Sequence, residues 1–260
     1  MSSEKFFTTK KALITLIAAS LVVIVSLGIR QTFGLFFFDF NADLNISISH
    51  FGFVIGLQLL MWGVFSPIFG FITDRYGGAT AIFIGFLFYL AGLFLFYSGL
   101  NTGYLFTLTI GLLIGIGLGG TAISIPVSVV AKHFPSSNRT IATGIVTCAG
   151  SFGFFVSPLL VRYSLIEIGW EITILYFCFL LGIGLITALF ISTPKTPVGN
   201  NDNNNQTAKE ALIEAFNNKS FIFLTLGFFV CGWHIALVAT HIPTYMMDRG
   251  MPDWTAAMIL

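Results

Sequence analysis

A single arginine, Arg30, lies inside the first hydrophobic run of this 260-residue chain, which extends from about Ala12 to Phe38. A helix of that length crosses the ~30 Å hydrocarbon core of a bilayer. A charge at such depth costs roughly 2.5–3.5 kcal/mol on insertion scales and is retained where it meets water or an anion. Because a guanidinium binds a carboxylate through two parallel hydrogen bonds, we predict that Arg30 faces an aqueous path and holds an anion. The alternative is that Arg30 extends outward to the membrane interface.

Two histidines in a later hydrophobic run could carry protons. His234 and His241 lie seven residues apart, so they share one face of a helix, with Trp233 before the first and Thr240 before the second. Histidine titrates in the physiological range, and ionisable groups within spans usually face the bundle interior or water. A pair of neutral histidines hydrogen-bonded within the protein is the alternative. No third ligand lies nearby in the sequence, so the pair does not predict a metal site.

The fourth hydrophobic run contributes two hydroxyl side chains, Thr121 and Ser124, after a series of glycines that ends at Gly120. The hydroxyls could line a transport path. The glycines are expected to serve helix packing, because small residues let helix backbones approach closely.

The composition indicates a membrane protein and excludes several other classes. Hydrophobic residues make up 56% of the chain and charged residues 9%, against about 25% charged residues in soluble domains. The net charge of +1 offers no basic face for nucleic acid. Three cysteines lie in apolar runs and are expected to be small buried side chains, without disulfide or metal spacing. No nucleophile elbow, zinc-protease motif or phosphate loop occurs, so neither an enzyme nor a cofactor is predicted.

Apolar runs of spanning length recur along the chain, and they predict an all-α membrane protein. They are about Ala12–Phe38, Ser49–Thr73, Thr80–Ser98, Tyr104–Ala131, Ile141–Val161, Trp170–Ile191 and Ser220–Tyr245, and an eighth run begins at Trp254–Leu260. We predict an N-terminal six-helix bundle over residues 1–192 and a cytoplasmic linker over 193–219, with a short surface helix at Ala208–Asn217. Residues 220–260 would begin a second bundle. Seven spans and a partial eighth favour a fragment that lacks its C-terminal helices.

The basic residues in the loops predict the orientation of the chain. They are more frequent in the alternate loops that include the N-terminus, which places the N-terminus in the cytoplasm by the positive-inside rule. On that side are Lys5, Lys10, Lys11, Arg75, Lys132, Arg139, Lys195, Lys209 and Lys219, and on the other only Arg162 and Arg249. The outward loops are then Asp39–Ser47, Gly99–Gly103, Arg162–Gly169 and Met247–Asp253. We expect a multi-pass protein of the plasma (inner) membrane, with the lipid bilayer as a partner.

The loop between the second and third runs carries the sequence GFITDRYGG from Gly70 onward. Gly70 and Gly77 would let backbones approach closely. Asp74 could meet the positive N-terminus of a neighbouring helix, an interaction made or broken as two halves move. A tight cytoplasmic turn, with its expected positive charge at Arg75, is the alternative.

The G-x-x-x-D-R-x-G pattern in this loop, within a six-plus-six arrangement, resembles the signature of the major facilitator superfamily. The resemblance implies a helical bundle of that type and a role for Gly70, Asp74, Arg75 and Gly77 in stabilising one gate state. The sequence differs from the pattern at Gly78 and the residue after it, where the family usually has basic residues.

Narrower features resemble the monocarboxylate-carrier-like and oxalate/formate-antiporter-like branch of that superfamily. They are Arg30–Gly34 in the first run, and Phe228–His234 and Thr240–Pro243 in the seventh. Members of the branch move small organic anions, often with a proton or by exchange. The resemblance implies a carboxylate site, and the candidate residues are Arg30, Gln31, Thr121, Ser124, Trp233, His234, Thr240 and His241.

We therefore expect a secondary transporter, symporter or antiporter, that moves a mono- or dicarboxylate by alternating access. A facilitator-type transporter of another small solute or a drug is the nearest alternative, although the fifth run lacks the G-P-x-x-G-G sequence of drug-exporting antiporters. A membrane receptor or structural protein is the alternative of another class, and it would leave a buried arginine without an explanation.

Overall fold

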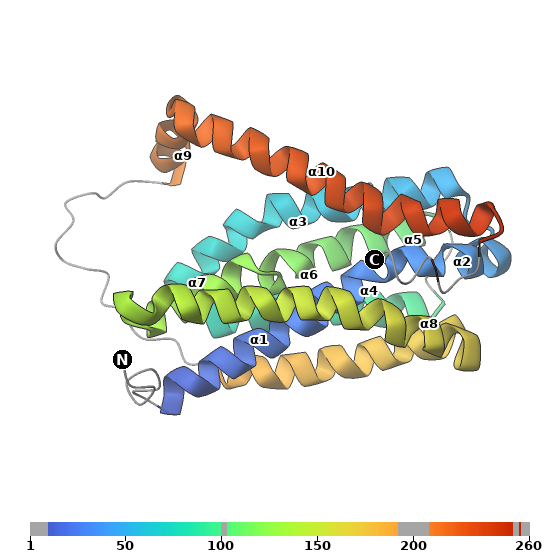
Figure 1. Ribbon diagram of the computed structural model, residues 1–260, viewed down its shortest axis with the longest axis horizontal. Coiled ribbons are helices and arrows are strands. Elements are labelled where there is room, and N and C mark those ends of the chain that lie inside the picture. The colour runs from blue at the N-terminus through green and yellow to red at the C-terminus, as the bar shows by residue number, and fades with distance from the viewer. Residues whose placement is uncertain (1–9, 100–102, 192–207, 252–254, 256–260) are drawn as a thin grey trace.

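The computed structural model describes residues 10–99, 103–191, 208–251 and 255, and their regular structure is helical (Figure 1). Six helices in this part of the chain are long and apolar enough to cross a membrane. One of them is broken at a glycine into two antiparallel arms, so the seven predicted spans are all present. The prediction of an all-α membrane protein is confirmed.

The first span extends further than its hydrophobic run predicts. It consists of α1 (Lys10–Gln31), the 3-10 turn η2 (Phe33–Phe36) and α2 (Phe37–Leu44). The prediction that Asp39 begins a loop is therefore wrong, because helix continues to Leu44. The physical reason is aromatic packing, since the buried ring of Phe40 lies within 5.2–5.9 Å, centroid to centroid, of four other aromatic rings: Phe36, Phe96, Phe106 and Trp170. Burying Phe40 stabilises this additional helical segment.

The second and third spans, α3 (Ile48–Tyr76) and α4 (Gly78–Tyr97), are joined by one residue. Gly77 has φ 97° and ψ 153°, a conformation that glycine adopts at no steric cost, and its N–H caps α3 by donating to the carbonyl of Thr73. At the other end of α3, the hydroxyl of Ser47 accepts a hydrogen bond from the His50 N–H at 3.2 Å, which makes Ser47 its N-cap.

The fourth span is segmented into α5 (Gly103–Phe106), the π-helical turn η3 (Thr107–Leu113), α6 (Ile114–Thr121) and α7 (Ser124–His133). Its glycines serve packing, as predicted. A Cβ on Gly115 would lie 2.6 Å from the carbonyl oxygen of Gln58 on α3, and a Cβ on Gly117 would lie 2.7 Å from that of Gly85 on α4. Glycine at these positions allows α6 to approach both neighbouring helices.

The fifth and sixth spans form one continuous element, α8 (Ser136–Leu189), which turns back at Gly169. A straight helix of its 54 residues would be ~81 Å long, and Figure 1 shows instead two arms that run in opposite directions. Gly169, with φ 79°, makes the turn, and the hydroxyls of Ser164 and Thr173 join the arms at 2.8 Å. The predicted loop Arg162–Gly169 is therefore wrong, since the chain stays helical until this glycine.

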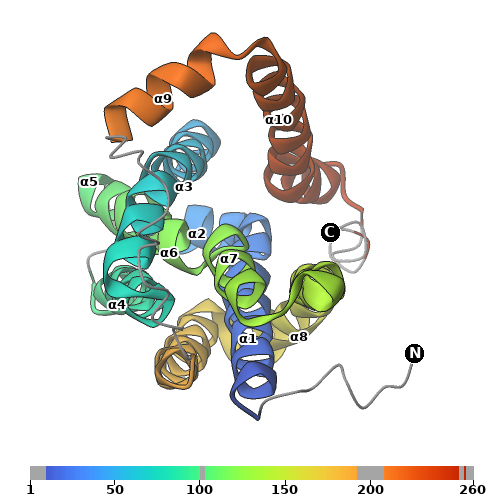
Figure 2. The ribbon, with the colours of Figure 1, turned by 90° about the vertical axis from the view of Figure 1, so that its left-hand side faces the viewer.

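Two further helices, α9 (Ala208–Asn217) and α10 (Lys219–Asp248), lie outside the group formed by α1 to α8 (Figure 2). The bounds of α9 are those predicted. Residues 193–207 of the predicted linker, and the predicted eighth run apart from Thr255, lie outside the described residues. The first half of α10 is exposed, and its buried residues are Ala239, Thr240, Pro243 and Thr244.

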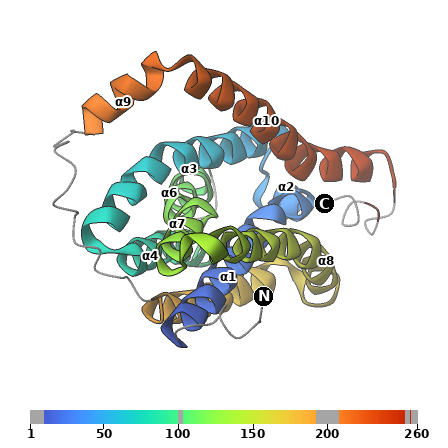
Figure 3. The ribbon, with the colours of Figure 1, turned by 60° about the vertical axis from the view of Figure 1, so that its left-hand side comes forward.

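The contact between α10 and the bundle is made at the η2 end of the first span, and α10 runs antiparallel to α3 (Figure 3). A Cβ on Gly34 would lie only 2.5 Å from the carbonyl oxygen of Ala239. Gly34 thus permits a backbone-to-backbone contact that holds α10 against the first span.

Two of the three cysteines differ from the prediction that they are buried. Cys178 is buried, whereas Cys148 and Cys231 are exposed on α8 and α10. Apolar neighbours in the sequence do not indicate burial here, because a helix in lipid is apolar on its outer face as well.

Candidate functional site

Arg30 is buried inside the bundle, with 4% of its surface exposed. Its Nε and Nη2 atoms have no hydrogen-bond partner in the structure, and no carboxylate among the described residues lies within 4 Å of the guanidinium. The side chain therefore does not reach the surface of the described bundle. A buried guanidinium that no described carboxylate neutralises is suited to receive an anion.

Two hydrogen bonds from neighbouring helices hold the turn of α1 that precedes Arg30, and the residues that form them are buried. Tyr89 on α4 donates a hydrogen bond from its hydroxyl to the carbonyl oxygen of Ser26 at 3.3 Å, and the Ser26 hydroxyl donates to the carbonyl oxygen of Thr121 at 3.0 Å. We call Ser26, Arg30, Tyr89 and Thr121 the Arg30 cluster. It joins α1, α4 and α6, and it links Thr121 to the helical turn that precedes Arg30.

Gln31, the next predicted residue, is also buried at the end of α1. Ser124 is not part of the Arg30 cluster, because it is exposed at the start of α7. The chain leaves helical geometry at Ala122, whose ψ is −178°, and this break separates Thr121 from Ser124. The two hydroxyls that the sequence places together therefore lie in different environments.

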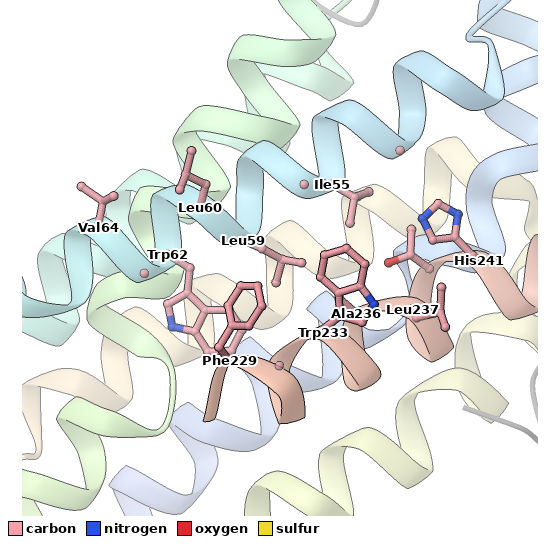
Figure 4. Close-up of a pocket in the computed structure, with 15 residues that line it drawn as sticks. Ile55, Leu59, Leu60, Trp62, Val64, Phe229, Trp233, Ala236, Leu237 and His241 are labelled. Carbon is pink, nitrogen blue, oxygen red and sulfur yellow. The ribbon is translucent and has the colours of Figure 1, made fainter. Parts of the chain in front are cut away.

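A second group of predicted residues lines a cavity of about 880 Å³ between α3 and α10 (Figure 4). Figure 4 shows Trp233 and His241 extending from α10 toward α3. Thr240 lines the same cavity, and a Cβ on Gly52 of α3 would lie 3.5 Å from Cε1 of His241. The other residues on the wall are apolar: Gly52, Ile55, Gly56, Leu59, Leu60, Trp62, Gly63, Val64, Phe229, Gly232, Ala236 and Leu237. The volume is within the ~300–1,000 Å³ typical of small-molecule sites.

His234 is exposed on α10 and does not line this cavity, although the sequence groups it with His241. Seven residues are slightly less than two full turns of a helix, so His234 and His241 do not point in quite the same direction. On the turn of α10 that contains His234, the residues that line the cavity are Trp233 and Leu237. Within the described residues, no group of three or more His, Cys, Asp or Glu side chains could hold a metal ion.

Sequence reasoning missed Ser26 and Tyr89. Ser26 had a detectable signal, since it precedes Arg30 by four residues and therefore shares its helix face. Tyr89 had none, because its position in the third span gives no indication that it contacts a carbonyl 63 residues earlier.

The predicted gate residues lie at the end of the bundle that also carries the α7–α8 turn. Asp74 accepts a hydrogen bond from Nζ of Lys132 at 2.8 Å, and the two residues form an ion pair. Lys132 lies in the last turn of α7. The described partner of this carboxylate is thus a lysine and not a helix N-terminus. Arg75 lies over the ring of Tyr76, with its Cζ 5.5 Å from the ring centroid.

The close backbone approach expected at Gly70 is not present, and Gly77 is explained by its backbone conformation. A Cβ on Gly70 would meet nothing within 4 Å, so Gly70 makes no close backbone approach in this structure. Gly77 is required by its positive φ. Gly78 stands where the signature usually has a basic residue, and a Cβ there would overlap the side chain of Val129 on α7. The close approach of α7 therefore excludes a side chain at this position.

Residues 19–260 match the family model described as Major Facilitator Superfamily. The chain is 25% identical over 247 residues to the agnestins efflux protein AgnL12 of Paecilomyces divaricatus, which covers 93% of this chain and 54% of the relative. It is 26% identical to the probable nitrate transporter NarT of Staphylococcus carnosus strain TM300, over 60% of this chain and 39% of the relative. It is 24% identical to the hexuronate transporter of Bacillus subtilis strain 168, over 80% of this chain and 50% of the relative. The chain spans about half the length of these curated relatives.

A solved structure shares the fold. The crystal structure of a D-xylose–proton symporter superposes on 95% of this chain and 64% of its own, with a TM-score of 0.67 and 15% identity. At that identity the likeness concerns the arrangement of helices alone.

Proposed function

Because this chain belongs to the Major Facilitator Superfamily, we propose that it forms part of a secondary transporter that moves a small organic anion, a mono- or dicarboxylate, by alternating access. The observation that carries the proposal is Arg30, which is buried with two nitrogen atoms unpaired and without a carboxylate among the described residues. A second six-helix bundle, of which α10 would be the first helix, would complete the path.

The energetic argument is that a buried arginine needs a compensating anion. A charged group buried without a partner is strongly unfavourable, and leaving even one buried donor unsatisfied costs ~1–3 kcal/mol. A carboxylate or nitrate that forms two parallel hydrogen bonds with a guanidinium offsets both costs. The binding of a transported anion would therefore supply the interaction that the described residues do not provide.

Two of the three curated relatives are named for anionic solutes, and the third is named an efflux protein for agnestins. One is named a probable nitrate transporter and another a hexuronate transporter, and both named solutes carry a negative charge. The resemblance of Arg30–Gly34 and the α10 stretches to the monocarboxylate-carrier-like branch favours a carboxylate. Nitrate is the second candidate, because it is a planar monoanion that fits the same guanidinium and is named for a relative.

The path would run between the first span and α10. We assign the end that carries α9, Asp74 and Lys132 to the cytoplasm, on the basis of the loop charges. The contact at Gly34 lies toward the opposite end, while the first half of α10 is exposed. The contact at Gly34 would close the outer side of the path in this state, with the start of α1 and α9 at the cytoplasmic side.

Uptake into proteoliposomes tests the proposal. The gene product, with any sequence that flanks residues 1–260, would be reconstituted and assayed with labelled lactate, oxalate, glucuronate and nitrate. We expect uptake of at least one carboxylate, its loss in Arg30→Ala and a large loss in Arg30→Lys, because lysine lacks the planar pair of donors. Arg139→Ala, at an exposed arginine on α8, is the matched control. Normal uptake by Arg30→Ala would show that the anion site is elsewhere.

Proton coupling, if a histidine carries it, has a separate test. His234→Gln is expected to retain exchange of internal for external anion and to weaken the pH dependence of net uptake. His133→Gln, on α7, is the control. An unchanged pH dependence in His234→Gln would remove the proposed role of this residue.

A further inference from the structure

We propose that Tyr89 is a positioning residue for Arg30. Its hydroxyl, together with that of Ser26, fixes the turn of α1 from which the guanidinium extends, and in this way it sets the affinity for the anion. The statement about affinity rests on the proposed function, whereas the positioning of Arg30 can be measured without transport.

The contact that carries this inference is a shared carbonyl. In an α-helix the N–H of residue 30 donates to the carbonyl of residue 26, and both residues lie within α1. The Tyr89 hydroxyl donates to that same Ser26 carbonyl at 3.3 Å. A carbonyl oxygen has two lone pairs and can accept both bonds. Tyr89 therefore holds the acceptor to which the backbone of Arg30 is bonded.

The same turn is anchored from a second helix. The Ser26 hydroxyl donates to the carbonyl oxygen of Thr121 on α6 at 3.0 Å, and Ser26, Tyr89 and Thr121 are all fully buried. Helical side chains lean toward the N-terminus, so the side chain of Arg30 extends over the turn that contains Ser26. Neither anchor uses Nε or Nη2 of Arg30, and both atoms remain available to an anion.

The position of Tyr89 is determined by glycine. A Cβ on Gly117 would lie 2.7 Å from the backbone nitrogen of Tyr89 and 2.8 Å from its Cβ. A side chain at position 117 would force α4 and α6 apart and withdraw the phenol from Ser26. The close approach of these helices thus places Tyr89 beside α1.

The expected effect on binding follows from pre-organisation. Immobilising a flexible side chain for binding has an entropic cost that a pre-positioned residue avoids, and for one side chain this corresponds to roughly two- to tenfold in affinity. Removal of the Tyr89 hydroxyl should raise the KM for the anion by about this factor and leave the maximal rate nearly unchanged.

The test compares Tyr89→Phe with Tyr97→Phe, which removes an exposed hydroxyl from the same helix. Protein labelled with 15N-arginine in lipid bilayers would be examined by solid-state NMR, with the Arg30 Nε resonance identified by its absence in Arg30→Lys. We expect this resonance to shift or broaden in Tyr89→Phe and to stay in place in Tyr97→Phe. Ser26→Ala, which keeps the carbonyl and loses the hydroxyl, should alter it in the same way to a smaller extent.

An Arg30 resonance that is the same in Tyr89→Phe as in the unaltered protein would overturn the positioning role. In the uptake assay, a lower maximal rate with an unchanged KM would also overturn it, because that result indicates only a loss of folded protein. Failure of the proposed function has a different signature, namely normal anion uptake by Arg30→Ala, and the resonance still reports on positioning in that case.

Discussion

Replacing Arg30 with methionine should make the protein more stable while abolishing anion uptake. The structure leaves two nitrogen atoms of a buried guanidinium without partners, and each unsatisfied buried donor costs ~1–3 kcal/mol. Methionine has a similar length and no charge, so it removes this cost. Imperfect repacking around methionine reduces the gain in stability by up to ~1.5 kcal/mol. Two such donors correspond to ~2–6 kcal/mol, so the net expectation is a gain of about 0.5–6 kcal/mol.

Thermal unfolding followed by tryptophan fluorescence, at one fixed heating rate, measures this gain. For a chain of this size ~1 kcal/mol corresponds to about 2–4 °C, so Tm should rise in Arg30→Met, by roughly 1–24 °C. The exposed Arg139 provides a matched control, and Arg139→Met should change stability by less than ~0.5 kcal/mol. A fall in Tm on replacing Arg30 would mean that a protein group already neutralises the guanidinium, and the reasoning for an anion site would then be refuted.

The same assay reports on the anion. A ligand that binds only the folded protein, at 100 times its Kd, stabilises by ~2.7 kcal/mol. Added oxalate, lactate or nitrate should therefore raise the Tm of the unaltered protein and leave that of Arg30→Met unchanged. Equal stabilisation of both proteins would show that the anion binds somewhere other than Arg30.

Three further predictions concern packing and the gate. Gly85→Ala should destabilise the protein by about 1–3 kcal/mol, because its Cβ would lie 2.9–3.0 Å from α6, whereas Gly56→Ala, with nothing within 4 Å, should not lower Tm, since alanine favours a helix more than glycine does. Gly34→Ala should reduce uptake about tenfold at normal expression, because its Cβ would lie 2.5 Å from a carbonyl of α10 and oppose closure; unchanged uptake would contradict this role. Asp74→Asn should lower the free energy of unfolding by no more than ~1 kcal/mol, since the ion pair of Asp74 with Lys132 is exposed. The double variant Asp74→Lys, Lys132→Asp, which exchanges the two charges, should recover this loss.

The parts of the fold that depend on local sequence were predictable. The spans follow from the length of the apolar runs, and α9 follows from a short amphipathic pattern after a polar linker. The helical extension from Asp39 to Leu44 was not predictable, because it depends on rings from three other spans that surround Phe40. The pairing of Asp74 with Lys132 was missed for the same reason, since 58 residues separate them.

For the candidate site, the sequence by itself determined that a membrane-embedded bundle contains one deeply placed arginine, because span length and hydropathy are properties of consecutive residues. Only the tertiary structure decided that Tyr89 and Thr121 meet the Ser26 turn and that His241 faces α3 while His234 does not. The physical reason is that lipid is as apolar as the protein interior. The apolar pattern of a span therefore does not reveal which face is turned inward, and that choice is made by helix packing at glycines and by buried hydrogen bonds.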